Sequence, residues 1–521
     1  MIELANVLGR GYFPKELPPP FKSITFGNTA AANADQLDAA IGVRTPTTRA
    51  AVHNLVRAGD LRRKLAVPNP LNYFRLSRYL VTNWPQLSAH VQGSVLSIST
   101  PVVSPIGRAL NPRVLIGDLP SQRASHRATV RYVLFADVAR CHPSIYTHSI
   151  PWALHGKAVA KANRAPGLLG NDLDTLMRSA QDGQTNGIPI GPDISLVVAE
   201  IVLSAADLQI TNRLRPCGFR HLDDYELGFT FLSEAETALA VLEEVLNEYE
   251  LALNSAKTRI VRLPDALEDD WVSDLNRVKI RSKGHGQRTD LIAYFNRAFE
   301  LAKTRPRDPV LSYAVASLRK QTLEADHGAL VQDLVLQTAL SEPATLRFSL
   351  ELLIRHRAAG LPIEHAKVAT ALNSLVTVHA PLGHGSEVIW ALWAAIALDI
   401  PLAAQAAQAL VGAADPFVGV VACDALQRGV LTGPDLWKSL RRRMLLKALT
   451  TEDWVLAYEG DCKGWCHPSR AGYTAKHPFF RILASNDVVF YDSATELTKI
   501  EKRIEDLTEL RVPVLGLVFG Y

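Results

Sequence analysis

The spacing of hydrophobic and polar residues changes several times along this chain, and each change predicts a different kind of structure. Four prolines within residues 11–21 rule out a regular helix, so residues 1–45 are expected to form a Pro-rich arm. Helical spacing then predicts helices over residues 47–93, with a break at residues 68–70. Short apolar runs between Pro and Gly predict strands, over 94–100, 112–119 and 129–138.

The middle of the chain has the pattern of a mixed unit of strands and helices. An apolar strand that ends in Asp137 is followed by an expected helix near Ser149 and by a longer helix over 192–214. Two strand-like runs then flank Asp223-Asp224, which predicts a hairpin with carboxylates at its turn. A final helix is expected over 233–251, followed by another hairpin or a strand over 253–263.

Strand signals stop after about residue 290, and Ala- and Leu-rich helical segments follow one another with Pro or Gly at the corners. Helix pairs that recur at roughly 35–40 residues are typical of an α-solenoid of HEAT-like repeats, and the alternative is a generic helical bundle. We therefore expect an α+β fold in four parts: an N-terminal arm over 1–45, an α+β unit over 46–285, HEAT-like α-repeats over 286–445, and a mixed segment over 446–521 that packs on the body.

Composition narrows the class of protein. Hydrophobic residues make up 48% and charged residues 21% of the 521 positions, which excludes a disordered or collagen-like chain. The five cysteines are scattered and odd in number, so they predict no disulfide framework. We expect no apolar run long enough to span a bilayer and no secretory leader, and hence a cytoplasmic protein without membrane contact.

Charge is unevenly distributed along the chain. Residues 1–180 carry a balance of +12 and residues 181–521 a balance of −8. Arginines alternate with aromatic residues over 62–80, a pattern that favours binding of nucleotides or nucleic acid; the alternative is a solvated basic surface.

Asp137 and Asp223-Asp224 are the strongest chemical signal. Transfer of a nucleotide by two metal ions requires carboxylates from adjacent strands that hold two Mg²⁺ about 4 Å apart. Mg²⁺ prefers oxygen ligands, so Asp is the expected residue type. An Asp-Asp pair alone is a weak signal, but one between apolar strands, after another Asp at a strand end, is stronger.

Four segments in chain order resemble the palm motifs of reverse transcriptases. Residues 135–157 resemble motif A, 184–207 motif B, 219–229 the YxDD box and 253–261 motif D. Together with residues 11–21 and the helical C-terminal half, the chain is similar to abortive-infection and other defence-associated bacterial reverse transcriptases. That resemblance implies fingers and palm over 46–285, followed by HEAT-like repeats in place of a standard thumb.

The resemblance also implies roles for single residues at the metal site. Asp137 and Asp223 would ligate two Mg²⁺, for which Mn²⁺ could substitute, and Asp224 would complete the cluster. The carbonyl of Val138 is a further candidate ligand. Lys257 would protonate the leaving pyrophosphate with a lowered pKa; a surface salt bridge is the alternative.

A second set of residues is expected to bind the nucleotide. Gln184, Gly187 and Pro189 would shape the pocket for base and sugar, and Arg62, Arg63 and Lys64 would grip the triphosphate or the product backbone. His142 stands where these enzymes usually place Phe or Tyr to reject the ribose 2′-hydroxyl, which leaves the choice between dNTP and rNTP open. His221 likewise replaces an aromatic residue.

The implied activity is that of an RNA-directed DNA polymerase, or DNA nucleotidyltransferase, acting on dNTPs in anti-phage defence. Some members of the resembled group start on a protein hydroxyl without a template, so a single-stranded DNA product attached to tyrosine is expected, with Tyr12 as first and Tyr521 as second candidate. Tyr12 could instead simply pack as part of a clasp. Members form trimers or hexamers, and a homo-oligomer is expected.

Two other hypotheses remain at this point. The chain could be an RNA-templated enzyme of retron or intron type that uses a non-coding RNA. It could also be a solenoid-based assembly protein whose palm is a relic, although intact Asp137, Asp223 and Asp224 argue against decay.

Overall fold

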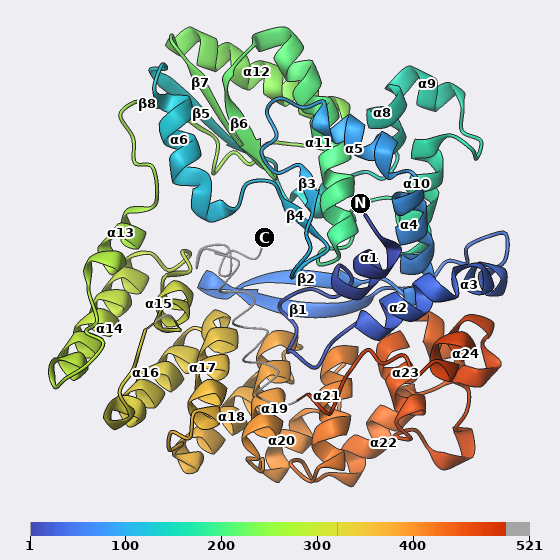
Figure 1. Cartoon of the computed structure of the whole chain (residues 1–521), viewed down its shortest axis with the longest axis vertical. Helices are drawn as coiled ribbons and strands as arrows, with labels where there is room; N and C mark the ends of the chain where they lie inside the picture. The colour runs from blue at the N-terminus through green and yellow to red at the C-terminus, as the bar shows by residue number, and fades with distance from the viewer. Residues whose placement is uncertain (1, 320, 496–521) are drawn as a thin grey trace.

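A four-stranded antiparallel sheet lies at one end of the molecule and a long curved row of helices at the other (Figure 1). This computed structural model describes residues 2–319 and 321–495. The expected mixture of strands and helices, followed by a helical C-terminal region, is confirmed.

The sheet brings together segments that are more than 120 residues apart in sequence. Its order is β6–β7–β5–β8, with all neighbours antiparallel, and its strands are β5 (Tyr132–Asp137), β6 (Cys217–His221), β7 (Asp224–Phe229) and β8 (Arg259–Arg262). In the central pair, Asp137 on β5 lies opposite Asp224 on β7. Leu134 and Leu227, which also lie opposite each other, are fully buried. The core contacts of this pair therefore fix the register that places the two acidic residues side by side.

Helices after β5 follow the expected order. The helix near Ser149, the long central helix and the helix before the last strand are confirmed. The helices of this part are α6 (Leu119–Arg127), α7 (Cys141–Ser144), α8 (Ser149–His155), α9 (Lys157–Ala162), α10 (Leu169–Ser179), α11 (Asp193–Leu214) and α12 (Leu232–Glu248).

The central helix α11 is long and apolar enough to cross a membrane by length and composition. The expectation that no segment of this kind exists is therefore wrong for α11. In the structure, 78% of its most apolar window is buried inside the protein, which is the situation of a core helix. Its apolar side chains pack on all sides, so the helix lacks the polar face of a surface helix.

The segment over 47–67 is a β-hairpin, not the predicted helix. Strands β1 (Ala51–Arg57) and β2 (Leu61–Val67) pair in antiparallel register through a short connection in which Gly59 has a φ of 70°. Glycine adopts this left-handed conformation without steric cost, and a short connection of this kind closes a hairpin. The turn signal outweighs the helical spacing. The helices predicted after it are correct, as α4 (Pro70–Thr82) and α5 (Trp84–Gln92).

Two of the three strands predicted over 94–138 are also wrong. Residues 94–100 are irregular, because Ser97 and Ser99 use their hydroxyls to bind Glu200 and neighbouring backbone N–H groups. Most of 112–119 is irregular or 3₁₀-helical as well. A small hairpin lies between them, formed by β3 (Pro101–Val103) and β4 (Leu110–Pro112).

The N-terminal residues are packed into the body and do not form a free arm. Three helices surround the proline-rich stretch: α1 (Leu4–Arg10), α2 (Ile24–Ala32) and α3 (Ala34–Ile41). Tyr12 is fully buried, its ring stacks on Tyr73 at 4.5 Å, and its hydroxyl donates a hydrogen bond to the carbonyl of Pro68 at 2.5 Å. Trp454 and Phe490 complete this aromatic cluster. Tyr12 thus packs as the clasp that the sequence left as an alternative, and a priming hydroxyl is not available there.

Helices α13 to α24 follow one another in the curved row (Figure 1). The change to helices after about residue 290 is confirmed, whereas the HEAT-like assignment and the boundaries at 45, 285 and 445 stay predictions. The row comprises α13 (Asp270–Arg277), α14 (Gly286–Thr304), α15 (Val310–Leu318), α16 (Gly328–Ser341), α17 (Leu346–Ala358), α18 (His365–His379), α19 (Gly385–Leu398), α20 (Ala404–Ala409), α21 (Pro416–Gln427), α22 (Pro434–Arg443), α23 (Trp454–Cys462) and α24 (Pro478–Ser485).

Substitutions at Tyr12 test this packing. Tyr12→Phe removes only the hydrogen bond to Pro68 and should lower the free energy of unfolding by about 1 kcal/mol. Tyr12→Ala empties a buried aromatic site and should cost about 3–5 kcal/mol. Thermal melts should rank the proteins wild type, Tyr12→Phe, Tyr12→Ala. Equal melting temperatures for all three would contradict the burial of this side chain.

Candidate active site

The three predicted acidic residues lie together at one edge of the sheet. Asp137 ends β5, Asp224 begins β7 directly beside it, and Asp223 occupies the turn between β6 and β7. The N–H of Val138 donates a hydrogen bond to the carbonyl of Asp223 at 3.0 Å, which ties the end of β5 to that turn. Pairing of β5 with β7 therefore brings together carboxylates that are separated by more than 80 residues.

Burial and mutual repulsion raise the pKa values of this group. Burial and then the charge of Asp137 raise the pKa of Asp223. Burial and then the charge of Asp223 raise the pKa of Asp224 to about 8, and a hydrogen bond with Asp137 acts in the same direction. A carboxyl group that retains its proton near neutral pH reports an excess of negative charge at the site.

Lys257 and Asn254 bind the same carboxylate from the segment before β8. The ammonium of Lys257 lies 2.6 Å from Oδ2 of Asp137, and the amide of Asn254 donates to Oδ1 at 2.8 Å. Burial lowers the pKa of Lys257, but the hydrogen bond to Asp137 and the charge of Asp224 outweigh it, so that the net shift is upward. The expected lowering of this pKa is therefore wrong, because Lys257 faces three acidic residues and its side chain is 60% exposed.

Residues of motif B pack against the segment that follows Asp137 in the chain. Residues 185–188 run alongside residues 142–147, with hydrogen bonds from Gly187 N–H to the carbonyl of Ile145 at 2.8 Å and from Ile188 N–H to that of His142 at 2.9 Å. Gly187 has a φ of 83°, and a Cβ there would lie 3.1 Å from the carbonyl oxygen of Pro143. The position thus requires glycine. Pro189 is buried next to it, whereas Gln184 is exposed.

His142 is half-buried next to the site. Burial and then the charge of Arg63 lower the pKa of His142 to about 4, so its imidazole is neutral at physiological pH. Cys141, immediately before it, is buried, and burial and then Asp223 raise the pKa of its thiol. His221, at the end of β6, is buried against the carbonyl of Val114, with Nε2 and that oxygen 3.1 Å apart.

The three basic residues expected to bind the triphosphate have different surroundings. Arg63 lies close enough to His142 and Asp223 for its charge to act on both. Arg62 instead forms an ion pair with Glu387 on α19, with N–O distances of 2.5 and 2.9 Å. Side chains alternate along β2, so Arg62 and Arg63 point to opposite faces of the hairpin. Lys64 is exposed. The expected role of Arg62 is thus corrected, because its guanidinium is held in the helical row.

One group of side chains in the described part of the chain has the spacing of a metal site. Its ligand atoms all lie within 4.8 Å of one another, and its members are His379, His384 and Glu387. Arg62 already supplies a positive charge there, 2.7 Å from Nδ1 of His384 and paired with Glu387. Asp137, Asp223 and Asp224 do not meet this spacing in the described structure.

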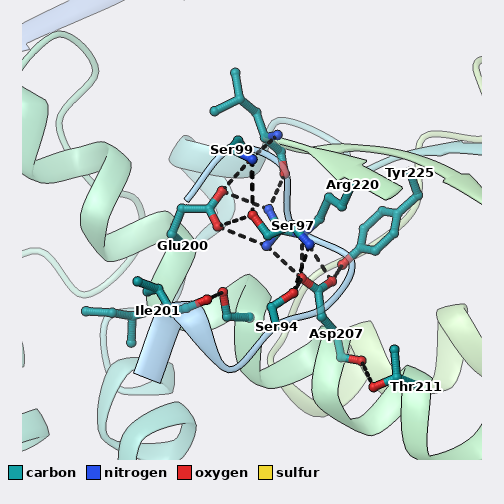
Figure 2. Close-up of polar contacts among 12 residues, drawn as sticks. Ser94, Ser97, Ser99, Glu200, Ile201, Asp207, Thr211, Arg220 and Tyr225 are labelled. Carbon is teal, nitrogen blue, oxygen red and sulfur yellow. Dashed lines mark hydrogen bonds and ion pairs between the residues drawn. The ribbon is translucent and has the colours of Figure 1, made fainter. Parts of the chain in front are cut away.

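Several supporting residues were missed by sequence reasoning. The backbone of Leu222, in the turn before Asp223, is bound by Ser99 and Arg220, and Arg220 in turn pairs with Glu200 and Asp207 of α11 (Figure 2). Glu200 and Asp207 interrupt an otherwise apolar helix, which is a sequence signal for a buried polar contact. Asn254 gives no such signal. Tyr521 lies outside the described residues.

The raised pKa of Asp224 gives a test of the site without any activity assay. Its pKa rises from 3.8 to about 8, so the folded protein keeps a proton that the unfolded chain has released. This contribution to stability is complete below about pH 4 and is lost as the pH rises through about 8. Asp224→Asn should therefore raise the melting temperature at pH 8 by about 1–3 °C in the presence of EDTA and flatten its pH dependence.

The matched control is Asp265→Asn, which changes an exposed carboxylate in a loop and should leave the pH dependence unaltered. A lower melting temperature for Asp224→Asn than for the wild type at pH 8, without metal, would show that Asp224 is not repelled by its neighbours.

Comparison with known proteins assigns this chain to no family. No model of a protein family matches the chain, and no curated protein matches it.

Proposed function

We propose that this protein is a nucleotidyl transferase of reverse-transcriptase type that synthesises DNA from dNTPs with the help of two divalent cations. One observation carries the proposal. Three of the four segments that resemble palm motifs, far apart in sequence, meet at Asp137, the turn with Asp223-Asp224, and Lys257. The fourth, motif B, is hydrogen-bonded through Gly187 and Ile188 to residues 142–145, which follow Asp137 in motif A.

The donor set fits Mg²⁺ or Mn²⁺. Asp137, Asp223 and Asp224 offer carboxylate oxygens, and the carbonyl of Val138 adds a neutral one, which are the ligand types that these ions prefer. The raised pKa values of Asp223 and Asp224 mark negative charge that bound cations would neutralise. Bound there, the ions would activate the attacking 3′-hydroxyl and stabilise charge on the leaving pyrophosphate.

The residues of the chain supply binding and proton transfer. The charge of Arg63 acts on Asp223, and Arg63 would bind the negatively charged triphosphate. The segment at Gly187 and Pro189 would hold the sugar and base, and the neutral imidazole of His142 would contact the sugar edge without attracting phosphate. Lys257 stays protonated and would give its charge, and then its proton, to the leaving pyrophosphate.

The hairpin β1–β2 and the sheet β6–β7–β5–β8 would correspond to fingers and palm, and the helical row to the HEAT-like repeats of the resembled group. Anti-phage defence, an assembly of three or six copies, and use of a non-coding RNA rest on that resemblance alone. Buried Tyr12 is not part of the proposal as a primer. The meeting of the three acidic residues with Lys257 argues against a relic palm.

Loss of one carboxylate tests the proposal directly. Asp223→Asn should lower dNTP incorporation by the purified protein at least about 10²- to 10³-fold, because charge that forms in the transition state would no longer be stabilised. Incorporation of radiolabelled dNTP, with and without template and primer, measures the effect, and Asp265→Asn is the control. Wild-type rates in Asp223→Asn would contradict the proposal.

The two neighbouring arginines offer a matched pair. Arg63→Ala should raise KM for dNTP about 10-fold or more, because it removes a charge beside the triphosphate site. Arg62→Ala should leave KM unchanged and lower the melting temperature, because it removes the guanidinium that pairs with the buried carboxylate of Glu387. Steady-state kinetics and thermal melts distinguish the two. The reverse pattern would mean that the faces of β2 have been assigned wrongly.

A further inference from the structure

The turn that carries Asp223 and Asp224 is held from behind by hydrogen bonds to a single residue, Leu222. The hydroxyl of Ser99 accepts a hydrogen bond from the N–H of Leu222 at 2.7 Å, and Nη1 of Arg220 donates to its carbonyl at 2.7 Å. Leu222 has a φ of 56°, in the left-handed region that side chains other than glycine rarely occupy. Both backbone polar groups of Leu222 are therefore bound by neighbours in a conformation that the chain would otherwise avoid.

Arg220 is itself held by two carboxylates of α11. The guanidinium lies 2.9 and 3.0 Å from the oxygens of Glu200 and 2.7 Å from Oδ2 of Asp207, and all three side chains are 1% exposed or less (Figure 2). Burial alone would raise the pKa of Glu200, but Arg220 and the serine hydroxyls lower it on balance. The carboxylate of Glu200 is therefore ionised, and its contacts with the guanidinium, together with those of Asp207, hold Arg220 against the carbonyl of Leu222.

Serine and tyrosine hydroxyls satisfy the remaining oxygen lone pairs. Ser97 and Ser99 each donate to Glu200 at 2.8 Å, while Ser94 and Tyr225 donate to Asp207 at 2.6 and 2.9 Å. A buried charge cluster of this kind is a poor source of stability, because the loss of hydration offsets the attraction. A geometric role explains its presence better, because the guanidinium of Arg220 also binds the backbone carbonyl of Leu222, in the turn before Asp223.

Ser97 and Ser99 differ in one respect. Both are fully buried and both donate to Glu200, but only Ser99 also binds the backbone of Leu222. The hydroxyl of Ser97 accepts instead from the N–H of Ser99, within its own loop. Ser97 and Ser99 are thus neighbouring buried serines that both donate to Glu200, and Ser99 is the one of the two that contacts the turn.

We infer that Ser99 and Arg220 are positioning residues for cation binding: they hold Leu222 in its left-handed conformation, so that Asp223 and Asp224 face Asp137. The inference rests on the proposed function, since it assigns to these residues an effect on the affinity of the same carboxylates for divalent cations.

The test is Mn²⁺ binding to the full-length protein, measured by electron paramagnetic resonance, in wild type, Ser99→Ala and Ser97→Ala. Ser99→Ala should weaken the affinity about three- to ten-fold, the range expected for loss of one buried hydrogen bond. Ser97→Ala should change the Mn²⁺ affinity less than about two-fold. Its melting temperature should decrease by about as much as that of Ser99→Ala. A purely structural role would move both variants equally.

Arg220→Lys provides a second measurement. It keeps a positive charge between Glu200 and Asp207, but one ammonium cannot bind both carboxylates and the carbonyl of Leu222 in the planar geometry of a guanidinium. Its Mn²⁺ affinity should fall at least as far as that of Ser99→Ala, while KM for dNTP stays within about two-fold of the wild type.

The outcomes separate the two claims. Equal Mn²⁺ affinity of Ser99→Ala and Ser97→Ala would overturn the positioning role and leave the proposed function standing. If Asp223→Asn binds Mn²⁺ with the same affinity as the wild type, both claims are overturned, because the turn would then hold no cation.

Discussion

Repulsion among three acidic side chains in a small, half-buried volume is the constraint around which this end of the protein is built. Asp137, Asp223 and Asp224 are placed together by strand pairing, although burial and their own charges oppose ionisation. Lys257 offsets part of the charge from outside the sheet. Behind the turn, Arg220 supports the backbone of Leu222, and its positive charge is balanced by the carboxylates of Glu200 and Asp207.

Strand β2 connects this site with the helical row. The alternation of side chains sends Arg63 toward the carboxylates and Arg62 toward Glu387, so a single strand contributes to both. The same hairpin is fixed to the row by His53, whose Nδ1 lies 2.7 Å from a carboxylate oxygen of Asp415, and by the N–H of Val56, which donates to the hydroxyl of Ser386. A shift of the hairpin against the row would therefore move Arg63 relative to the site.

The two ends of the described chain meet on the other side of the hairpin. Tyr12 lies among Tyr73 of α4 and Trp454 of α23, and the indole N–H of Trp454 donates to the carbonyl of Val67 at the end of β2. Phe21 packs edge-on against Tyr491 at 5.1 Å. These contacts hold the proline-rich segment in place and make the helical row and the sheet-bearing half parts of one continuous hydrophobic core.

By itself the sequence determined much about the sheet-bearing half. Strand β5, helices α11 and α12, the hairpin with Asp223 and Asp224 at its turn, and the change to helices near residue 290 all follow from local periodicity, because each depends on which face of one element is apolar. The motif order was also enough to select Asp137 and Lys257 as partners of that hairpin. The helical spacing over 47–67 was misleading, because a turn at Gly59 decided the structure there.

Only the tertiary structure decided which polar groups meet. Nothing local distinguishes Arg62 from Arg63, or Ser97 from Ser99. The two members of each pair differ in the residues that they contact on distant elements. The burial of Tyr12 depends on aromatic residues more than 400 positions away. The pKa of Lys257 moves upward because three carboxylates from other strands surround it. Charge and hydrogen bonding act through space, so their outcome depends on the packed fold and cannot be derived from spacing along the chain.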